Sequence, residues 1–234
     1  MVATDHTSAA APSGNWLANQ PYLLLSLTAL FWAGNAVLGR AVAGHIPPVT
    51  LAFIRWGGAF LIVLPFAWRY LVQDWPVIRK HLGVMVLISI AGIGAFNTLQ
   101  YFALERTNAL NILLLQSSGP LFVAIWSLML LGIRLTLKQA IGLCVSLLGV
   151  LAILLKGDFS ALAAIRFNDG DLLFILALAI FGFYSVMALK RPPIHSMSFL
   201  AFTFGCGAVV QIPLVVWEMK VRPLMQIDLP NLLA

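Results

Sequence analysis

The sequence predicts an all-α polytopic membrane protein, and its composition is the first observation that does so. Hydrophobic residues make up 61% of the 234 residues and charged residues 9%, whereas a soluble domain has roughly 45–50% apolar and about 25% charged residues. The second observation is that the apolar residues fall in long runs almost free of charge, as membrane-spanning helices require. The third is a weak internal repeat, which predicts an inverted five-plus-five arrangement of helices of which about seven are present.

Seven apolar runs are each long enough to cross roughly 30 Å of hydrocarbon at a rise of about 1.5 Å per residue. They cover about 22–43, 49–70, 82–103, 110–131, 136–155, 171–189 and 197–217. The lipid bilayer is therefore the first partner that the sequence predicts. The net charge of +6 does not indicate nucleic acid, because the basic residues sit in short connections, where Lys and Arg normally flank membrane spans.

The segment before the first run is expected to be a disordered tail. Residues 1–20 contain no Lys or Arg, and the apolar run that follows them is longer than the core of a cleaved signal peptide. The first helix is therefore expected to be retained in the membrane.

A weak self-match at an offset of about 149 residues predicts the domain organisation. The most specific matches join the second run to the seventh: Gly58 with Gly207, Ala59 with Ala208, and Trp68 with Trp217. A unit of five helices that recurs must enter the membrane from the opposite side the second time, which makes the repeat inverted. We expect a first repeat over 21–155, a linker over 156–170 and the start of a second repeat over 171–234.

The same offset also predicts that three further helices belong to the fold. It places the start of an eighth helix near residue 230 and projects a length of about 304 residues. A site between inverted halves needs walls from both, so residues 1–234 alone are expected not to transport. Helix faces without an intramolecular partner are then left to lipid or to another chain, and a homodimer is one arrangement that covers them.

Four stretches of the sequence resemble the EamA repeat of the drug/metabolite transporter superfamily. They are "FWAGNAVLGR", "PPVTLAFIRW", "YFALERTNALNILLLQSSGPLFVAIWSLMLLGIRLTLKQAIGLCVSLLGV" and, in the second half, "GDLLFILALAIFGFYSV". The resemblance covers about 22–217 and implies a ten-helix metabolite carrier, commonly an exporter, in the cytoplasmic membrane. One departure is Ile133 in "LGIRLT", where the family usually has a glutamate, so the role of that acid does not carry over.

Arg55 is the charged residue that lies deep inside a predicted span, about 9 Å from the start of its helix. One interpretation is that its side chain snorkels outward to the headgroups. The other is that it faces the bundle and pairs with helix carbonyls, a neighbouring helix or an anionic substrate group. The resemblance at "LAFIRW" favours an inward arginine with a structural or gating role.

Pro120 predicts a kink near the centre of the fourth run. Proline cannot donate to the carbonyl of Gln116, so polar backbone is expected to be exposed beside Gln116 and Ser117. Kinked helices near the membrane midplane are sites where transporters bind substrates. The alternative is an ordinary packing kink.

Further polar and aromatic residues lie near the middle of other runs and complete the candidate substrate-binding set. They are Trp32 and Asn35 on the first run, Asn97, Gln100 and Tyr101 on one face of the third, and Tyr184, which the repeat pairs with Asn35. For any one of them, an interhelical hydrogen bond worth about 1 kcal/mol is the alternative role.

The remaining titratable residues narrow the function. All acidic residues and histidines fall in the tail, in connections or at helix ends, so no proton carrier is expected within the membrane. No HExxH motif is present, and neither a metal, a cofactor nor an intramembrane enzyme is predicted. The leading hypothesis is a transporter of small metabolites that works by alternating access. The alternative is a truncated, transport-inactive membrane fragment or interaction partner.

Overall fold

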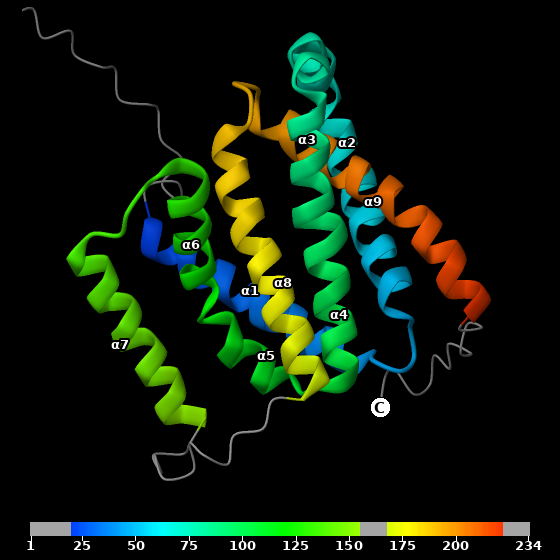
Figure 1. Cartoon of the computed structure of the whole chain (residues 1–234). Helices are drawn as coiled ribbons and strands as arrows, with labels where there is room; N and C mark the ends of the chain where they lie inside the picture. The colour runs from blue at the N-terminus through cyan, green and yellow to red at the C-terminus, as the bar shows by residue number, and fades with distance from the viewer. Residues whose placement is uncertain (1–19, 155–167, 222–234) are drawn as a thin grey trace, which may run out of the picture.

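The computed structural model of this chain describes residues 20–154 and 168–221 and is helical apart from short connections (Figure 1). In order, the helices are α1 (Pro21–Ala41), α2 (Pro48–Lys80), α3 (Leu82–Ser89), a π-helical segment (Ile90–Phe96), α4 (Asn97–Arg106), α5 (Ala109–Gln116), α6 (Gly119–Leu131), α7 (Leu137–Leu154), α8 (Asp169–Met187), a short 3₁₀ turn (Ala188–Lys190) and α9 (Ser196–Val221). The described ranges contain no strand, so the all-α prediction is confirmed. The predicted tail, most of the linker and the end of the second repeat lie outside these ranges.

Five described helical stretches are long and apolar enough to cross a membrane, which confirms a multi-pass membrane protein. They are α1, α2, the continuous stretch of α3, the π-helical segment and α4 (Leu82–Arg106), α8 with its 3₁₀ turn, and α9. The count rises to six if α5 and α6, which meet at a bend of 41°, form one broken span. Helix α7 is apolar but shorter than the length a span requires. The predicted count of seven spans therefore stays a prediction.

Helix α2 is longer than the sequence predicted. The prediction ended this helix at residue 70, whereas the helix continues to Lys80. A charge-free run shows only which part of a helix lies in lipid. The helix itself can continue past the lipid, because charged residues such as Asp74 and Arg79 are compatible with helical structure. Ile78, which is fully buried, anchors this extension.

The predicted kink at Pro120 is confirmed as a complete break between α5 and α6. Pro120 has no N–H, and its ring excludes the carbonyl of the residue four positions earlier. The hydroxyl groups of Ser117 and Ser118 donate to the carbonyl oxygens of Leu114 and Leu115, at 2.6 and 2.7 Å. The same two carbonyls also accept the backbone N–H groups of Ser117 and Ser118, at 3.2 and 2.9 Å, so each carbonyl at the end of α5 is paired twice within the turn.

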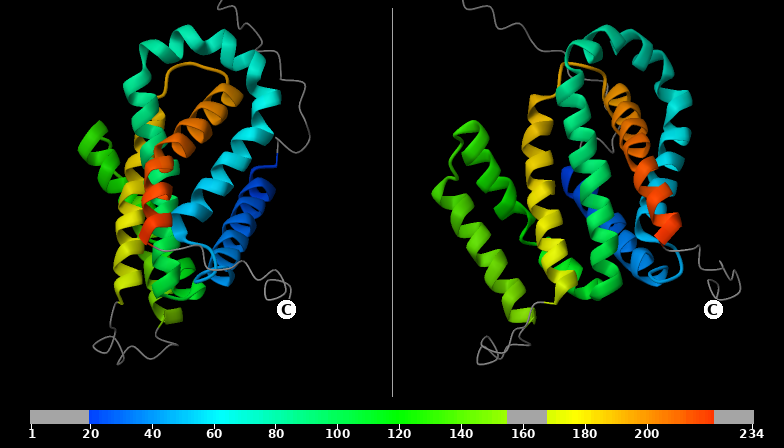
Figure 2. Two further views of the ribbon diagram at one scale, coloured as in Figure 1. Left: turned by 90° about the vertical axis from the view of Figure 1, so that its right-hand side faces the viewer. Right: turned by 45° about the vertical axis from the view of Figure 1, so that its right-hand side comes forward.

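Helices α2 and α9 pack against each other in opposite directions (Figure 2). A carboxylate accepts hydrogen bonds at each end of the pair. The Glu218 carboxylate accepts hydrogen bonds from the backbone N–H groups of Val49 and Thr50 at the start of α2, at 3.1 and 2.8 Å. At the other end, Asp74 accepts from the N–H of His195 and the hydroxyl of Ser198, at 2.8 and 2.6 Å. Each helix therefore caps the orphan N–H groups of the other.

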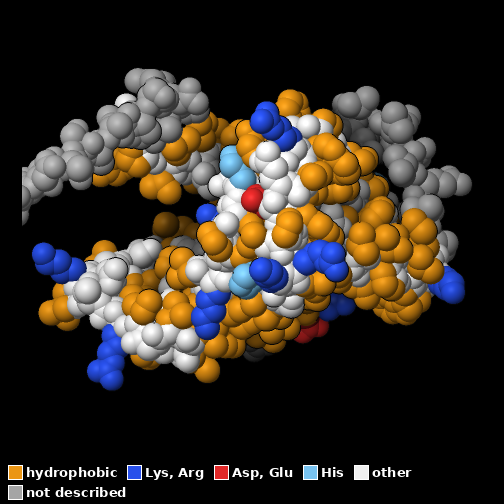
Figure 3. All heavy atoms as spheres, turned by 90° about the horizontal axis from the view of Figure 1, so that it is seen from above, with side chains coloured by type: hydrophobic (Ala, Val, Ile, Leu, Met, Phe, Trp, Pro, Cys, Tyr) orange, Lys and Arg blue, Asp and Glu red, His pale blue; other side chains and the backbone are white. Residues whose placement is uncertain are grey.

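Helix α8 lies in the middle of the bundle, between α4 and α6, while α7 lies at its outer edge (Figure 1). One buried apolar cluster joins α8 to α1, α2, α4 and α5, and a second joins it to α3 and α9. Seen from above, Lys and Arg side chains project from the end of the molecule, and hydrophobic side chains cover much of the surrounding surface (Figure 3). This distribution fits a protein whose sides face lipid.

Candidate functional site

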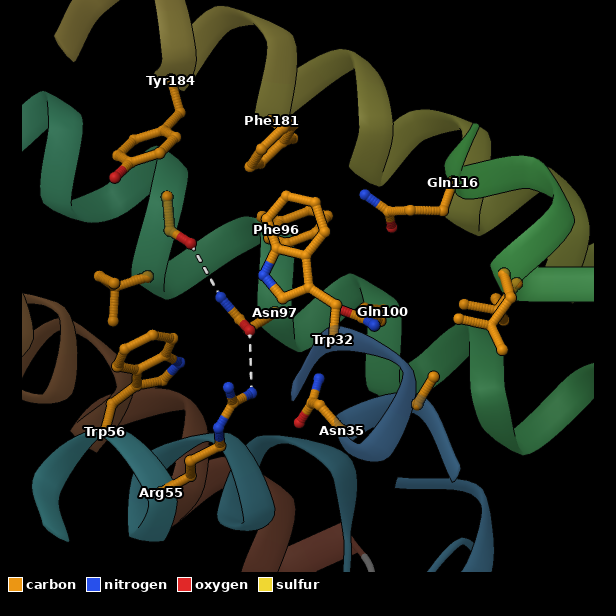
Figure 4. A pocket seen from close by; sticks show the side chains of 15 residues that line it. Trp32, Asn35, Arg55, Trp56, Phe96, Asn97, Gln100, Gln116, Phe181 and Tyr184 are labelled. Carbon is orange, nitrogen blue, oxygen red and sulfur yellow. Dashed lines mark hydrogen bonds between the residues drawn. The ribbon is translucent and has the colours of Figure 1, made fainter. Parts of the chain in front are cut away.

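A cavity of about 310 Å³ lies between α1, α2, the π-helical segment, α4, α5 and α8 (Figure 4). One part of its wall is polar and consists of Asn35, Arg55, Asn97, Gln100 and Gln116. Another part is aromatic and consists of Trp32, Trp56, Phe96, Phe181 and Tyr184. The rest is formed by Ala36, Gly92, Ile93, Ile112 and Leu113.

Arg55 points from α2 toward α4 and the cavity (Figure 4). Its Nη1 donates to the Tyr101 hydroxyl at 2.8 Å and to Oδ1 of Asn97 at 3.3 Å. The guanidinium carbon also lies 4.9 Å from the centre of the Trp56 ring, within the range of a cation–π interaction. These contacts correspond to the inward interpretation of Arg55 and not to a side chain that reaches outward to headgroups.

Tyr101 and Asn97 connect Arg55 to other parts of the bundle. The Tyr101 hydroxyl donates to Oδ1 of Asn35 on α1 at 2.9 Å, and the Asn97 amide donates to the Gly92 carbonyl at 2.9 Å. Tyr101 is only 4% exposed and does not line the cavity itself. Its hydroxyl positions Arg55 and Asn35 through these hydrogen bonds from outside the cavity wall.

The π-helical segment Ile90–Phe96 shapes one side of the cavity. A π-helix forms i→i+5 hydrogen bonds in place of the usual i→i+4 bonds, and such segments often occur at functional sites. Gly92 lies directly against the Tyr184 ring, and a Cβ atom at this position would overlap the ring. The close approach of α8 to this segment therefore requires glycine at residue 92.

The aromatic wall is built around Phe181. Its ring centre lies 6.0 Å from that of Trp32, 5.0 Å from that of Phe96 and 6.0 Å from that of Tyr184. These spacings are typical of packed aromatic pairs. The wall therefore presents ring surface from α1, the π-helical segment and α8 to the cavity.

The structure gathers six of the eight predicted substrate-binding residues around this cavity, namely Trp32, Asn35, Asn97, Gln100, Gln116 and Tyr184. Tyr101 lies behind the wall, as described above. Ser117 does not line this cavity, and its hydroxyl donates back to the Leu114 carbonyl on α5.

Ser117 and Pro120 instead line a second, more open cavity of about 670 Å³, formed largely by α6 and α7. The two cavities share Trp32, Gln116 and Phe181. The break between α5 and α6 thus lies next to the first cavity, although its serine and proline face the second.

The sequence prediction missed Trp56, Phe96 and Phe181. A signal for Phe181 was present, because the repeat offset of about 149 residues pairs Phe181 with Trp32, and the two rings are in contact. Trp56 and Phe96 had no comparable signal, since aromatic residues are common throughout apolar helices.

Two acidic residues that the sequence placed at helix ends prove to be buried. Glu218 is 1% exposed and caps α2, and Asp171 accepts a hydrogen bond from the Thr107 hydroxyl at 2.7 Å. Neither residue lines the cavity. Their burial follows from hydrogen bonds to helix ends, which the sequence could not reveal.

These apolar helices define a multi-pass membrane protein that has a partly polar cavity inside its bundle. Residues 19–155 match the EamA-like transporter family, and the chain belongs to this family.

Relatives of this chain are also named as transporters. An uncharacterized transporter of Archaeoglobus fulgidus is 29% identical over 202 residues, which are 83% of this chain and 66% of the relative. The uncharacterized transporters YyaM and YetK of Bacillus subtilis are both 25% identical, over 85% and 84% of this chain and 66% and 60% of their own lengths. The chain thus spans about two thirds of the length of these relatives. No solved structure matches it.

Proposed function

We propose that the protein is a membrane carrier that binds a small metabolite in the cavity around Arg55 and exports it across the cytoplasmic membrane by alternating access. The observation that carries this proposal is the cavity itself. Side chains from α1, α2, α4 and α5 bring one cation and four amides together between apolar helices. Polar groups at such depth are costly in lipid and therefore indicate a binding site or a pathway.

The lining residues favour binding over catalysis. In the described part of the chain, the cavity wall contains no Ser, Cys, His, Asp or Glu. A nucleophile and a general base, the usual requirements of a hydrolase or transferase site, are therefore missing from this wall. The side chains that are present can orient a ligand by hydrogen bonds and aromatic contacts.

Alternating access requires parts that move, and two features support such motion. The break between α5 and α6 provides a hinge beside the cavity. The antiparallel pair α2–α9, closed at one end by Glu218 and at the other by Asp74, has the opposed directions that an inverted repeat requires. We propose that α8 and α9 begin the second repeat and that its motion against the first opens the cavity to each side in turn.

The outer position of α7 leaves its faces open to a second chain. Small residues occur on this helix at Gly142, Ser146 and Gly149, a pattern that favours close helix packing in membranes. We also propose that two copies form a homodimer through α7. In each copy, we propose a first repeat over 21–155, a linker over 156–170 and the start of a second repeat over 171–234.

The proposal is tested by filling the cavity. Leu113 on α5 lines it, and Leu113→Trp would occupy part of its volume. Leu110→Trp on the same helix is the control, because Leu110 is 63% exposed and lies outside the lining. Cells that express the protein at its full encoded length should enrich at least one metabolite in the medium, and only Leu113→Trp should abolish this. Equal export by wild type and Leu113→Trp at matched membrane levels would refute the proposal.

A further inference from the structure

We infer that the cavity selects an organic anion, whose oxyanion group binds Arg55 and Trp56 while its apolar or aromatic body lies against Trp32 and Phe181. This inference rests on the proposed function of the cavity as the substrate site. It adds a substrate class and the residues that select it.

The first argument is charge. The Arg55 guanidinium brings a positive charge to the cavity, and the cavity wall contains no acidic residue among the described residues. Asn97 and Tyr101, the hydrogen-bond partners of Arg55, are both neutral. The positive charge of the cavity is therefore not neutralised by the described wall, and a ligand with a negative charge would neutralise it.

The second argument is the count of free donors. Both hydrogen bonds of Arg55 use Nη1, so Nε and Nη2 have no acceptor among the described residues. The indole N–H of Trp56, which also lines the cavity, is buried and has no acceptor there either. A carboxylate has two acceptor oxygens and can bind a guanidinium edge with two parallel hydrogen bonds.

The third argument is that the acceptors close to Arg55 each already accept one hydrogen bond. Oδ1 of Asn35 accepts from Tyr101, and Oδ1 of Asn97 accepts from Arg55 itself. The Gly92 carbonyl accepts from the Asn97 amide. This part of the wall therefore has donors without any partner among the described residues, whereas its acceptors are each partly used, and this balance favours a ligand that accepts hydrogen bonds.

The fourth argument concerns the body of the ligand. The rings of Trp32, Phe96 and Phe181 pack together beside the polar residues, and a ring or short aliphatic group can lie against them. The volume of about 310 Å³ is at the lower end of the range for ligand sites. A small anion with one apolar group matches both properties. An organic cation would also bind ring faces, but here it would meet the like charge of Arg55.

The test uses three probes that share a ring and differ in charge: phenylacetate, phenylacetamide and 2-phenylethylamine. The full-length protein is purified into nanodiscs, and binding is measured by isothermal titration calorimetry. Phenylacetate should bind about tenfold tighter than the other two probes, because only its head group pairs with a cation. Arg55→Gln should weaken phenylacetate binding about tenfold and change phenylacetamide binding less than about threefold.

Two further variants keep the test informative. Arg55→Lys retains the charge and should restore part of the preference for the anion, whereas Arg69→Gln, on the same helix but outside the cavity, should leave all affinities unchanged. An equal or stronger affinity for the amide or the amine would overturn the inference, as would an Arg55→Gln variant with an unchanged preference or binding of none of the probes. The proposed function is judged separately, since export that Leu113→Trp abolishes would stand even if the anion preference failed.

Discussion

At the scale of single residues, the Arg55 side chain determines how the cavity is organised. One guanidinium joins α2 to α4 through Tyr101 and Asn97, and Tyr101 extends the connection to Asn35 on α1. The cation–π contact with Trp56 adds a neighbour on its own helix. Removal of the Arg55 side chain should therefore remove the positive charge from the cavity and break the hydrogen-bond chain that joins α1, α2 and α4.

We predict that Arg55→Ala lowers export about tenfold or more, because the charge at depth is lost and the hydroxyl of Tyr101 loses a donor. Arg69→Ala, at an exposed position on the same helix, should lower export less than about twofold. Initial export rates of the full-length protein, at matched membrane levels, provide the measurement. Equal rates for the two variants would mean that Arg55 has no special role.

At the scale of helices, the structure depends on carboxylates that cap the partner helix and on glycines that allow close approach. Glu218 accepts three hydrogen bonds from the first residues of α2, which include the Thr50 hydroxyl at 3.0 Å. Between α6 and α8, Gly182 lies so close to the backbone of Phe122 that a Cβ atom would be 2.9 Å from its carbonyl oxygen. The first contact fixes how α9 meets α2, and the second fixes how α8 meets α6.

We predict that Glu218→Ala destabilises the protein by about 1–3 kcal/mol, because the buried N–H groups of Val49 and Thr50 lose their acceptor. Thermal unfolding of the purified protein in detergent measures this change. Asp169→Ala serves as the control, since Asp169 is exposed and contributes only to the first turn of α8. An unchanged melting temperature for Glu218→Ala would show that water replaces the carboxylate.

We also predict that Gly182→Ala lowers stability by about 1–3 kcal/mol, because the neighbour that must move is backbone and not a flexible side chain. Gly57→Ala is the matched change on α2, where a Cβ atom meets nothing within 4 Å. Alanine there should be neutral or stabilising by up to about 1 kcal/mol. The same thermal assay compares the two, and a stable Gly182→Ala variant would contradict the packing of α6 on α8.

The sequence was sufficient to predict most of the helical segments and the polar part of the cavity wall, for identifiable reasons. Charge-free runs locate the lipid-crossing helices, and polar residues inside such runs are rare enough to indicate a site, which is why Asn35, Asn97 and Gln100 were found. The remaining features depend on tertiary contacts. Neither the π-helical segment at Ile90–Phe96 nor the hydrogen bond of the Ser117 hydroxyl back to the Leu114 carbonyl has a signature in the order of residues alone.

At the scale of the whole molecule, the account depends on the path of the chain through the membrane. The connection between α1 and α2 lies at one end of the bundle, and those after α6 and after α8 lie at the other (Figure 1). This path follows only if α7 crosses the membrane, although it is shorter than the other spans. The inverted repeat depends on the same crossing.

We predict that cysteines at Ile133 and Pro193 are labelled from one side of the membrane and a cysteine at His45 from the other. The three positions are exposed in connections, and the native Cys144 and Cys206 are first replaced by serine. An impermeant maleimide applied to intact cells and to inside-out vesicles gives the sidedness. Labelling of Pro193 on the same side as His45 would show that α7 does not span and would overturn the five-plus-five arrangement.

The central claim is that the cavity around Arg55 is an aqueous substrate site that opens to both sides of the membrane in turn. It is tested most directly by a single cysteine at Gln100, which lines the cavity and is 6% exposed. We predict that an impermeant thiol reagent modifies Gln100→Cys both in intact cells and in inside-out vesicles, and that this modification stops export. Adding Leu113→Trp to the same protein should prevent the modification. A cysteine that reacts from neither side while export continues would contradict the claim.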